Sequence, residues 1–328
     1  MMDAMKFRTE IQPLNHAGLI SHTDSIMLLG SCFSDNIGRL LATRLFDTCI
    51  NPFGPLYNAA SINAAVQRII SGRPYTETDL CQSENGQWFC FDCHTKMNRS
   101  SATCLAENLN HELAVANAFI NKASTVCLTL GTAWIYRLAS TGNIVANCHK
   151  LPANKFIRQR QTVEEAYASL NDTVSSLKAI NPDVRIIVTV SPIRHMADGM
   201  HGNQISKATL LLACEQLAAK HSNVIYFPSY EIMMDDLRSY RFYATDMKHP
   251  SDVAIEYIYQ IFAQSFFSKT TSDICSKALS LTKRLEHKHI TTDEKSRKLF
   301  EAETLKLASG LEKTYPELTP VLKQILQQ

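Results

Sequence analysis

Residues 25–38 read SIMLLGSCFSDNIG, an apolar run that leads through Gly-Ser into a helical pattern. The run at 25–29 has the length and composition of a buried strand, and residues 36–44 are expected to be helical. Gly30 permits a tight turn that would place Ser31 at the end of the strand, where the following helix offers backbone N–H groups to an acyl oxyanion. Ser31 would serve equally well as a simple cap of that helix.

Four further apolar runs have the same character and alternate with helical stretches. The runs lie at 46–50 (FDTCI), 125–130 (TVCLTL), 184–190 (VRIIVTV) and 224–227 (VIYF). Helical stretches lie at 61–70, 163–180 and 206–221. Strands that alternate with helices predict an α/β fold, in which helices cover a mainly parallel, doubly wound sheet.

The chain is expected to form one α/β domain with a helical tail. Ser251 can cap the last core helix, DVAIEYIYQIFAQSFF, and no linker or repeat divides residues 1–270. Residues 271–328 are charged and amphipathic without a strand pattern, which predicts a helical C-terminal extension. Two long stretches, at about 72–122 and 137–161, are predicted to be insertions that form the walls of a substrate pocket beyond the carboxyl ends of the strands.

Composition limits the expected partners and location. The 328 residues carry 33 Lys plus Arg against 31 Asp plus Glu, so neither nucleic acid nor an anionic membrane is an expected partner. The N-terminal sequence lacks the apolar core of a signal peptide, and no apolar run approaches the roughly 20 residues of a membrane helix. We therefore expect a cytoplasmic protein with a small-molecule or glycan substrate and reduced cysteines. The sequence makes no prediction of the oligomeric state.

A second group of polar residues precedes the last core helix. In the sequence YATDMKH, Asp246 stands three residues before His249. Within one turn, this spacing allows the carboxylate to hold the imidazole Nδ1–H while Nε2 faces a nucleophile, as a general base requires. A turn Asp beside a solvated His would have the same pattern. Because Ser31 and this pair both follow strands, they would meet at the carboxyl edge of a parallel sheet.

Several motifs occur together in the order found in one bacterial family. They are GSCFSDNIG (30–38), NPFGPLYN (51–58), LGTAW (130–134), VANCHK (145–150), TVSPIRH (189–195) and FPSYEIMMDDLRSYRFYATDMKHPS (227–251). On these motifs, residues 25–265 resemble the GSCFA family, which is related to the SGNH (GDSL-type) hydrolases. The resemblance implies a flavodoxin-like three-layer α/β/α fold, with Ser31 as nucleophile and Asp246 and His249 completing a catalytic triad.

The resemblance also implies two oxyanion donors, a Gly after the second strand and an Asn after the third. Gly54 matches the first donor, although a simple turn glycine would look the same. In GTAW, Ala133 stands where SGNH enzymes have the Asn. Asn147 is the nearest candidate substitute, unless it bonds its own backbone as loop Asn residues often do. The loss of one oxyanion donor typically costs about 10²–10³ in rate.

Two more sets of residues are candidates for binding. Arg194 and His195 close the fourth strand, where they are expected either to bind substrate or to lie in solvent. The motif Cys90-x-x-Cys93-His94 matches c-type haem attachment, but no export signal is visible, and a zinc site would need a second pair of ligands. We expect instead an alternating strand in the first insertion, with His94 able to reach the pocket.

Together these residues predict a serine esterase of the SGNH type. It would hydrolyse a small O-acyl ester, such as an acetyl ester, on a carbohydrate or cell-wall-related substrate. His249 would deprotonate Ser31, Asp246 would orient His249, and backbone N–H groups near Ser31 with Gly54 would hold the oxyanion. No metal or cofactor is expected. Two alternatives remain open, an O-acyltransferase that uses the same serine and a catalytically silent binding module with the same fold.

Overall fold

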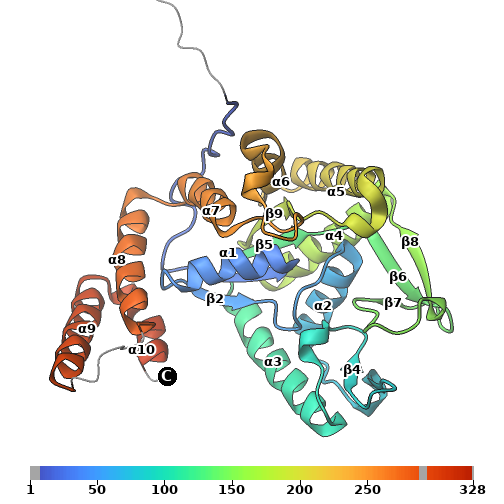
Figure 1. The fold of residues 1–328 in the computed structure, drawn as a ribbon, viewed down its shortest axis with the longest axis horizontal. Helices are drawn as coiled ribbons and strands as arrows, with labels where there is room; N and C mark the ends of the chain where they lie inside the picture. The colour runs from blue at the N-terminus through green and yellow to red at the C-terminus, as the bar shows by residue number, and fades with distance from the viewer. Residues whose placement is uncertain (1–7, 288–293, 327–328) are drawn as a thin grey trace, which may run out of the picture.

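A five-stranded parallel sheet forms the centre of the computed structural model, which describes residues 8–287 and 294–326 (Figure 1). Its strands lie in the order β10-β9-β5-β1-β2, and each neighbouring pair is parallel. Counted along the chain, this order is 2-1-3-4-5, as in flavodoxin-like folds, which confirms the predicted fold class. The five predicted runs are the strands β1 (Ser25–Gly30), β2 (Asp47–Ile50), β5 (Thr125–Leu130), β9 (Arg185–Val190) and β10 (Val224–Tyr226).

Helices cover both faces of this sheet and make it the middle of three layers (Figure 1). Successive residues of a strand point to opposite faces, so Ile26 and Leu28 belong to one core and Met27 and Leu29 to the other. The first core lies under α1 (Cys32–Ala42) and α7 (Asp252–Phe266). The second lies under α2 (Ala59–Ser71), α3 (Ala102–Lys122), α4 (Val163–Ile180) and α5 (Gly199–Lys220).

Side-chain caps mark where three of these helices begin. The Ser251 hydroxyl accepts a hydrogen bond from the Ala254 N–H (3.3 Å) and caps α7, as predicted. Ser31 caps α1, and Asn58 caps α2. Ser31 follows β1 directly, and Asn58 follows β2 after the loop 51–57, so both polar side chains lie beyond the carboxyl ends of their strands.

The first predicted insertion, 72–122, divides into two different parts. Its first half contains two 3₁₀ turns (Glu77–Asp79 and Thr95–Met97) and an antiparallel hairpin of β3 (Leu80–Gln82) and β4 (Trp88–Cys90). The expected alternating strand ends at Cys90 because the chain turns there. Its second half is α3, which belongs to the helical layer because its leucines are buried in the main core.

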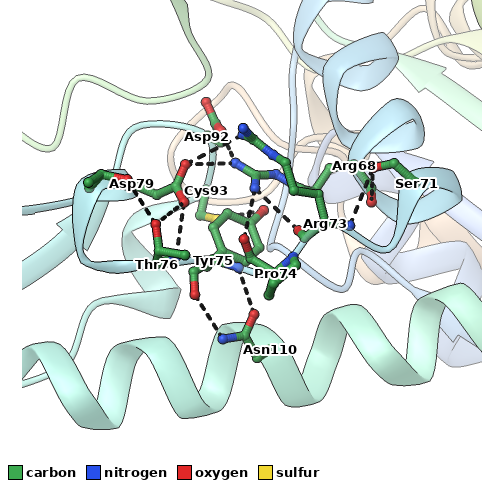
Figure 2. Close-up of polar contacts among 11 residues, drawn as sticks. Arg68, Ser71, Arg73, Pro74, Tyr75, Thr76, Asp79, Asp92, Cys93 and Asn110 are labelled. Atoms are coloured by element: carbon green, nitrogen blue, oxygen red, sulfur yellow. Dashed lines mark hydrogen bonds and ion pairs between the residues drawn. The ribbon is translucent and has the colours of Figure 1, made fainter.

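A buried arginine connects this hairpin segment to α2. Arg68, only 7% exposed, forms ion pairs with Asp79 (3.0 Å) and Asp92 (3.3 Å). Its guanidinium lies 4.2 Å from the centre of the Tyr75 ring. Figure 2 shows these groups together with two backbone carbonyls of the same segment that accept hydrogen bonds from Arg68. The arginine therefore satisfies acceptors from several turns of the segment at once.

The second predicted insertion, 137–161, lies within a small antiparallel sheet in the order β7-β6-β8. Its strands are β6 (Trp134–Leu138), β7 (Ile144–Val145) and β8 (Phe156–Arg160), and a 3₁₀ turn (Ala153–Lys155) precedes β8. Because β6 starts shortly after β5 ends, this sheet stands beyond the carboxyl edge of the central sheet (Figure 1).

The C-terminal part is helical, as predicted. The helices α8 (Lys269–Leu285), α9 (Glu294–Thr314) and α10 (Thr319–Leu326), with a 3₁₀ turn (Pro316–Leu318), surround an apolar cluster that also contains Leu45. Of the predicted domain and extension, residues 1–7, 288–293 and 327–328 lie outside the described residues. Within the described part, no helix has the length and apolar character needed to cross a membrane.

Candidate active site

Ser31 lies where β1 ends and α1 begins, at the carboxyl edge of the sheet. The preceding residue must be small, because a Cβ on Gly30 would lie 2.1 Å from the Thr129 carbonyl oxygen. The φ angle of Gly30, +139°, also favours glycine. The Ser31 N–H donates to the same carbonyl (3.0 Å), and the Ser31 hydroxyl accepts the Phe33 N–H (3.3 Å). The turn therefore holds Ser31 beside the N-terminus of α1.

The Asp246–His249 pair comes from the long connection between β10 and α7. This connection contains α6 (Ser229–Glu231), a π-helical segment (Ile232–Leu237) and a 3₁₀ turn (Tyr240–Phe242). The Asp246 Oδ2 lies 2.6 Å from the His249 Nδ1, and Oδ1 accepts the backbone N–H groups of His249 (3.0 Å) and residue 248 (2.9 Å). These hydrogen bonds, from His249 first, hold the pKa of Asp246 well below its ordinary value. An ionised Asp246 keeps the imidazole proton on Nδ1 and leaves Nε2 as an acceptor.

One cavity of about 430 Å³ brings Ser31 and His249 together. Arg194 and His195, the predicted substrate-binding residues, also line it. Asp246 is not among the lining residues and reaches the cavity only through His249. The structure thus brings Ser31 and His249 to the same cavity as both predicted binding residues, with Asp246 bonded to His249 behind it.

The side chain of Cys32, the first residue of α1, lies close to that of His249. Its Sγ lies 3.8 Å from the His249 Nε2, whereas the hydroxyl of Ser31, a residue only 1% exposed, is bonded to the Phe33 N–H. Burial, followed by the charge of Asp35, raises the pKa of the Cys32 thiol. Ser31 can reach His249 only if its hydroxyl rotates away from the helix cap. Such hydrogen bonds often become short only when substrate is bound.

A family model described as the GSCFA family matches residues 25–262. The chain belongs to the GSCFA family. The match begins at β1 and ends within α7, so it contains Ser31, Asp246 and His249. Comparison with curated protein sequences gave no match.

Solved structures similar to this GSCFA protein include three esterases. A carbohydrate esterase family 3 structure from Talaromyces cellulolyticus is 11% identical, with 77% of this chain and 99% of that chain covered and a TM-score of 0.34. The family 3 carbohydrate esterase of Clostridium thermocellum is 14% identical, with 77% and 97% covered and a TM-score of 0.31. A mutant acetyl esterase determined with an acetate ion is 11% identical, with 80% and 100% covered and a TM-score of 0.35. Likeness at this level does not bear on the reaction of the GSCFA protein.

The structure does not bring the two expected oxyanion donors to the cavity. The Gly54 N–H donates to the Asn51 carbonyl (2.7 Å). A Cβ on Gly54 would lie 2.6 Å from the His94 Cβ, so close packing explains this glycine. The Asn147 Oδ1 accepts the His149 N–H (2.8 Å), and Asn147 does not line the cavity. Both residues therefore stabilise the turns in which they lie.

Two residues that sequence reasoning did not single out, Tyr57 and Asn58, line the cavity. The Tyr57 carbonyl accepts the N–H groups of Gly131 (2.8 Å) and Thr132 (2.9 Å), which connects this loop to the end of β5. A Cβ on Gly131 would lie 3.4 Å from both the Ser31 Cβ and the Tyr57 ring. The available signal in the sequence was the NPFGPLYN motif, whose final Asn directly precedes a helical stretch.

His94 does not line the cavity itself, but its side chain is hydrogen-bonded to Tyr57, which does. Its Nδ1 accepts the Lys96 N–H (3.2 Å), so a neutral imidazole carries its proton on Nε2 and donates it to the Tyr57 hydroxyl oxygen (3.3 Å). Burial, followed by the charge of Lys96, lowers the pKa of His94 and favours this neutral form. The Tyr57 O–H has no acceptor among the described residues and can donate to a group in the cavity.

A buried lysine supports the same edge of the sheet. Lys207 of α5 is 1% exposed and donates from Nζ to the carbonyls of Gly131 (2.7 Å) and Ser191 (2.6 Å), which follow β5 and β9. Burial lowers the pKa of Lys207 to about 7. Burial, followed by the charge of Lys207, lowers the pKa of His195 to about 4. His195 is therefore neutral at pH 7, and its Nε2 is enclosed and has no hydrogen-bond partner among the described residues.

The small sheet of β6 to β8 forms one wall of the cavity. Trp134 and Tyr136 of β6 and Arg158 of β8 all line it. The Arg158 guanidinium lies 3.8 Å from the centre of the Trp134 ring and forms an ion pair with Asp198. The predicted second insertion therefore contributes an aromatic and charged wall.

The Cys90-x-x-Cys93-His94 motif has a packing role in its first two positions. Cys90 and Cys93 are 2% and 0% exposed, and the Cys93 Sγ lies 3.7 Å from the Tyr75 hydroxyl. Burial raises the pKa of the Cys93 thiol. In the part of the chain that the structure describes, no three His, Cys, Asp or Glu side chains are grouped as metal ligands.

Proposed function

We propose that this GSCFA protein is a serine esterase of the SGNH type that hydrolyses a small O-acyl ester. One observation carries the proposal: Ser31, at the N-terminus of α1, and His249, held by the ionised Asp246, line the same cavity. A hydroxyl nucleophile, a general base and a third group that orients the base are the parts that acyl transfer through a serine requires.

In the proposed reaction, the His249 Nε2 takes the hydroxyl proton of Ser31 as Oγ attacks the acyl carbonyl carbon. The C–O bond to the alcohol then breaks, and His249 returns the proton to the leaving oxygen. Water, deprotonated by His249, releases the acyl group from Ser31 in the second half of the reaction. Asp246 stabilises the imidazolium that forms in each half.

We propose an acetylated carbohydrate or cell-wall-related compound as the substrate. The cavity volume of about 430 Å³ falls in the range of small-molecule sites, about 300–1,000 Å³. Trp134 and Tyr136 offer apolar edges, while Arg194 offers hydrogen bonds to hydroxyl groups. Both kinds of contact suit a sugar ring with a small ester.

A second candidate nucleophile is Cys32, because its Sγ lies 3.8 Å from the His249 Nε2. The raised pKa of the thiol argues for Ser31, since the thiolate is the reactive form of a cysteine. In that alternative the cavity would still be an acyl-transfer site, but the acyl group would be carried as a thioester.

Hydrolysis of p-nitrophenyl acetate and of a panel of O-acetylated sugars tests the proposal. We expect Ser31→Ala and His249→Ala each to reduce kcat/KM by at least about 10³, and Cys32→Ala to stay within about threefold of wild type. Loss of activity in Cys32→Ala with retention in Ser31→Ala would assign the nucleophile to Cys32. Equal rates for wild type and all three folded variants would rule out an esterase.

A further inference from the structure

The proposed reaction places negative charge on the acyl oxygen, and that charge needs hydrogen-bond donors in the cavity. The Cys32 N–H, at the first position of α1, has no acceptor within the helix and is therefore a candidate for one such donor. The Gly54 N–H is bonded to the Asn51 carbonyl, and Asn147 does not line the cavity. A second donor must therefore come from another residue.

Asn58 carries a side-chain N–H group and lines the same cavity as Ser31 and His249. The residue is 4% exposed. Its Oδ1 accepts the Ser61 N–H (2.8 Å) as the cap of α2, which identifies the oxygen and fixes the orientation of the amide. Among the described residues, its Nδ2 has no hydrogen-bond acceptor. The Nδ2 atom is also not fully buried, so it keeps some solvent-accessible surface in a residue that lines the cavity.

The backbone holds Asn58 beside the nucleophile. The Leu56 N–H donates to the Gly30 carbonyl (2.8 Å), directly before Ser31. The Tyr57 carbonyl accepts two N–H groups from the end of β5, at Gly131 and residue 132. The loop that carries Asn58 is thus bonded to the ends of β1 and β5.

We propose that Asn58 is the side-chain oxyanion donor of this enzyme, and this rests on the proposed function. When the Ser31 Oγ forms its bond to the acyl carbon, the C=O π electrons move to the oxygen. The Asn58 Nδ2–H donates a hydrogen bond to that oxyanion, and no proton is transferred. The bond strengthens as charge develops, so it contributes to kcat more than to substrate binding.

The competing explanation is that Asn58 only caps α2. Asp and Ser both serve as N-caps, but neither has the amide N–H group. Asn58→Asp and Asn58→Ser therefore separate the two roles while they preserve the start of the helix. Ser101→Ala, which removes the cap of α3 away from the cavity, is the control for the loss of a cap.

The experiment measures kcat and KM for p-nitrophenyl acetate in these variants beside wild type and Ser31→Ala, with thermal unfolding of each. We expect both Asn58 variants to lose about 10²–10³ in kcat, with KM within about threefold and unfolding unchanged. The Ser101→Ala control should keep the wild-type kcat. Wild-type kcat in both Asn58 variants, with Ser31→Ala inactive, would overturn the Asn58 assignment and leave the esterase proposal standing. Full activity in Ser31→Ala would overturn both.

Discussion

Asp246 accepts three hydrogen bonds, two from backbone N–H groups and one from the His249 Nδ1. They lower the pKa of Asp246, so its carboxylate stays ionised across the pH range of an enzyme assay. Loss of activity in mild acid would therefore not result from protonation of Asp246. The role of this carboxylate is tested by substitution and not by pH.

We predict that Asp246→Asn reduces kcat by about 10⁴, because an amide does not select the tautomer with a proton on Nδ1. The change keeps the size of the side chain and an oxygen for the two backbone N–H groups. Asp235→Asn, at an exposed acid in the same connection, is the matched control and should be fully active. Steady-state kinetics on an acetyl ester measure both. A fully active Asp246→Asn would contradict the triad.

The positions of the side chains proposed to react could be predicted from sequence, but those of the proposed oxyanion donors could not. Ser31 and His249 both follow strands of a parallel sheet, and chain order alone places them at one edge. Gly54 and Asn147 lie in turns whose own backbone groups compete for their hydrogen bonds. Asn51, at φ +42°, turns the chain so that the Gly54 N–H meets its carbonyl, and residue spacing does not report such an angle.

Among the secondary-structure elements, the strands of the central sheet were predicted more completely than the helices that cover it. The five short apolar runs alternate along the chain with helical stretches, which identifies them as buried parallel strands. All five form the central sheet. The helix α3 was not predicted, because residues 102–122 fell within the long stretch 72–122 that was expected to be an insertion. Its leucines Leu105, Leu109 and Leu113 recur every four residues and form its buried face.

One arginine of α2 stabilises the hairpin segment that precedes α3. We predict that Arg68→Met destabilises the protein by about 3–5 kcal/mol, because it leaves the partly buried carboxylate of Asp79 without its partner. Arg73→Met is the matched control. The Arg73 side chain is 68% exposed and 3.5 Å from the same carboxylate, so its loss should cost less than about 1 kcal/mol. Urea unfolding measures both, and equal losses would contradict the account.

The stabilisation that Asp79 gives to the folded protein should decrease as the pH falls. Burial opposes its ionisation, but hydrogen bonds from Thr76 and Arg68 outweigh burial, and the pKa of Asp79 is lowered in the folded protein. The unfolded chain then binds more protons, so the stabilisation is complete above the unfolded pKa of about 4 and is lost as pH falls through the folded pKa. The difference in unfolding free energy between wild type and Arg68→Met should shrink in that acid range.

Over the whole molecule, the C-terminal helices and the cavity occupy different ends of α1. Ser31 begins this helix, whereas Leu45, just beyond its end, packs against α8 to α10. The Thr282 hydroxyl of α8 also donates to the Thr43 carbonyl at that end (2.8 Å). The helical extension therefore packs at the end of α1 opposite Ser31, and Figure 1 shows α8 to α10 together at one edge of the domain.

We predict that Leu281→Ala lowers the unfolding free energy by about 2–5 kcal/mol, because the residue is fully buried in the α8–α10 cluster. Its kcat and KM should equal those of wild type at a temperature where both are folded. Leu285→Ala, at a 38% exposed leucine of the same helix, should have a much smaller effect on stability. A large change in kcat for a folded Leu281→Ala would show that the extension takes part in the site.

The most direct test of the central claim is to label the protein with a fluorophosphonate and locate the adduct by peptide mass spectrometry. The account predicts one adduct, on Ser31, that is absent from Ser31→Ala, strongly reduced in His249→Ala and retained in Cys32→Ala. An adduct on Cys32, or no adduct on folded wild-type protein, would contradict the claim that Ser31 is the nucleophile.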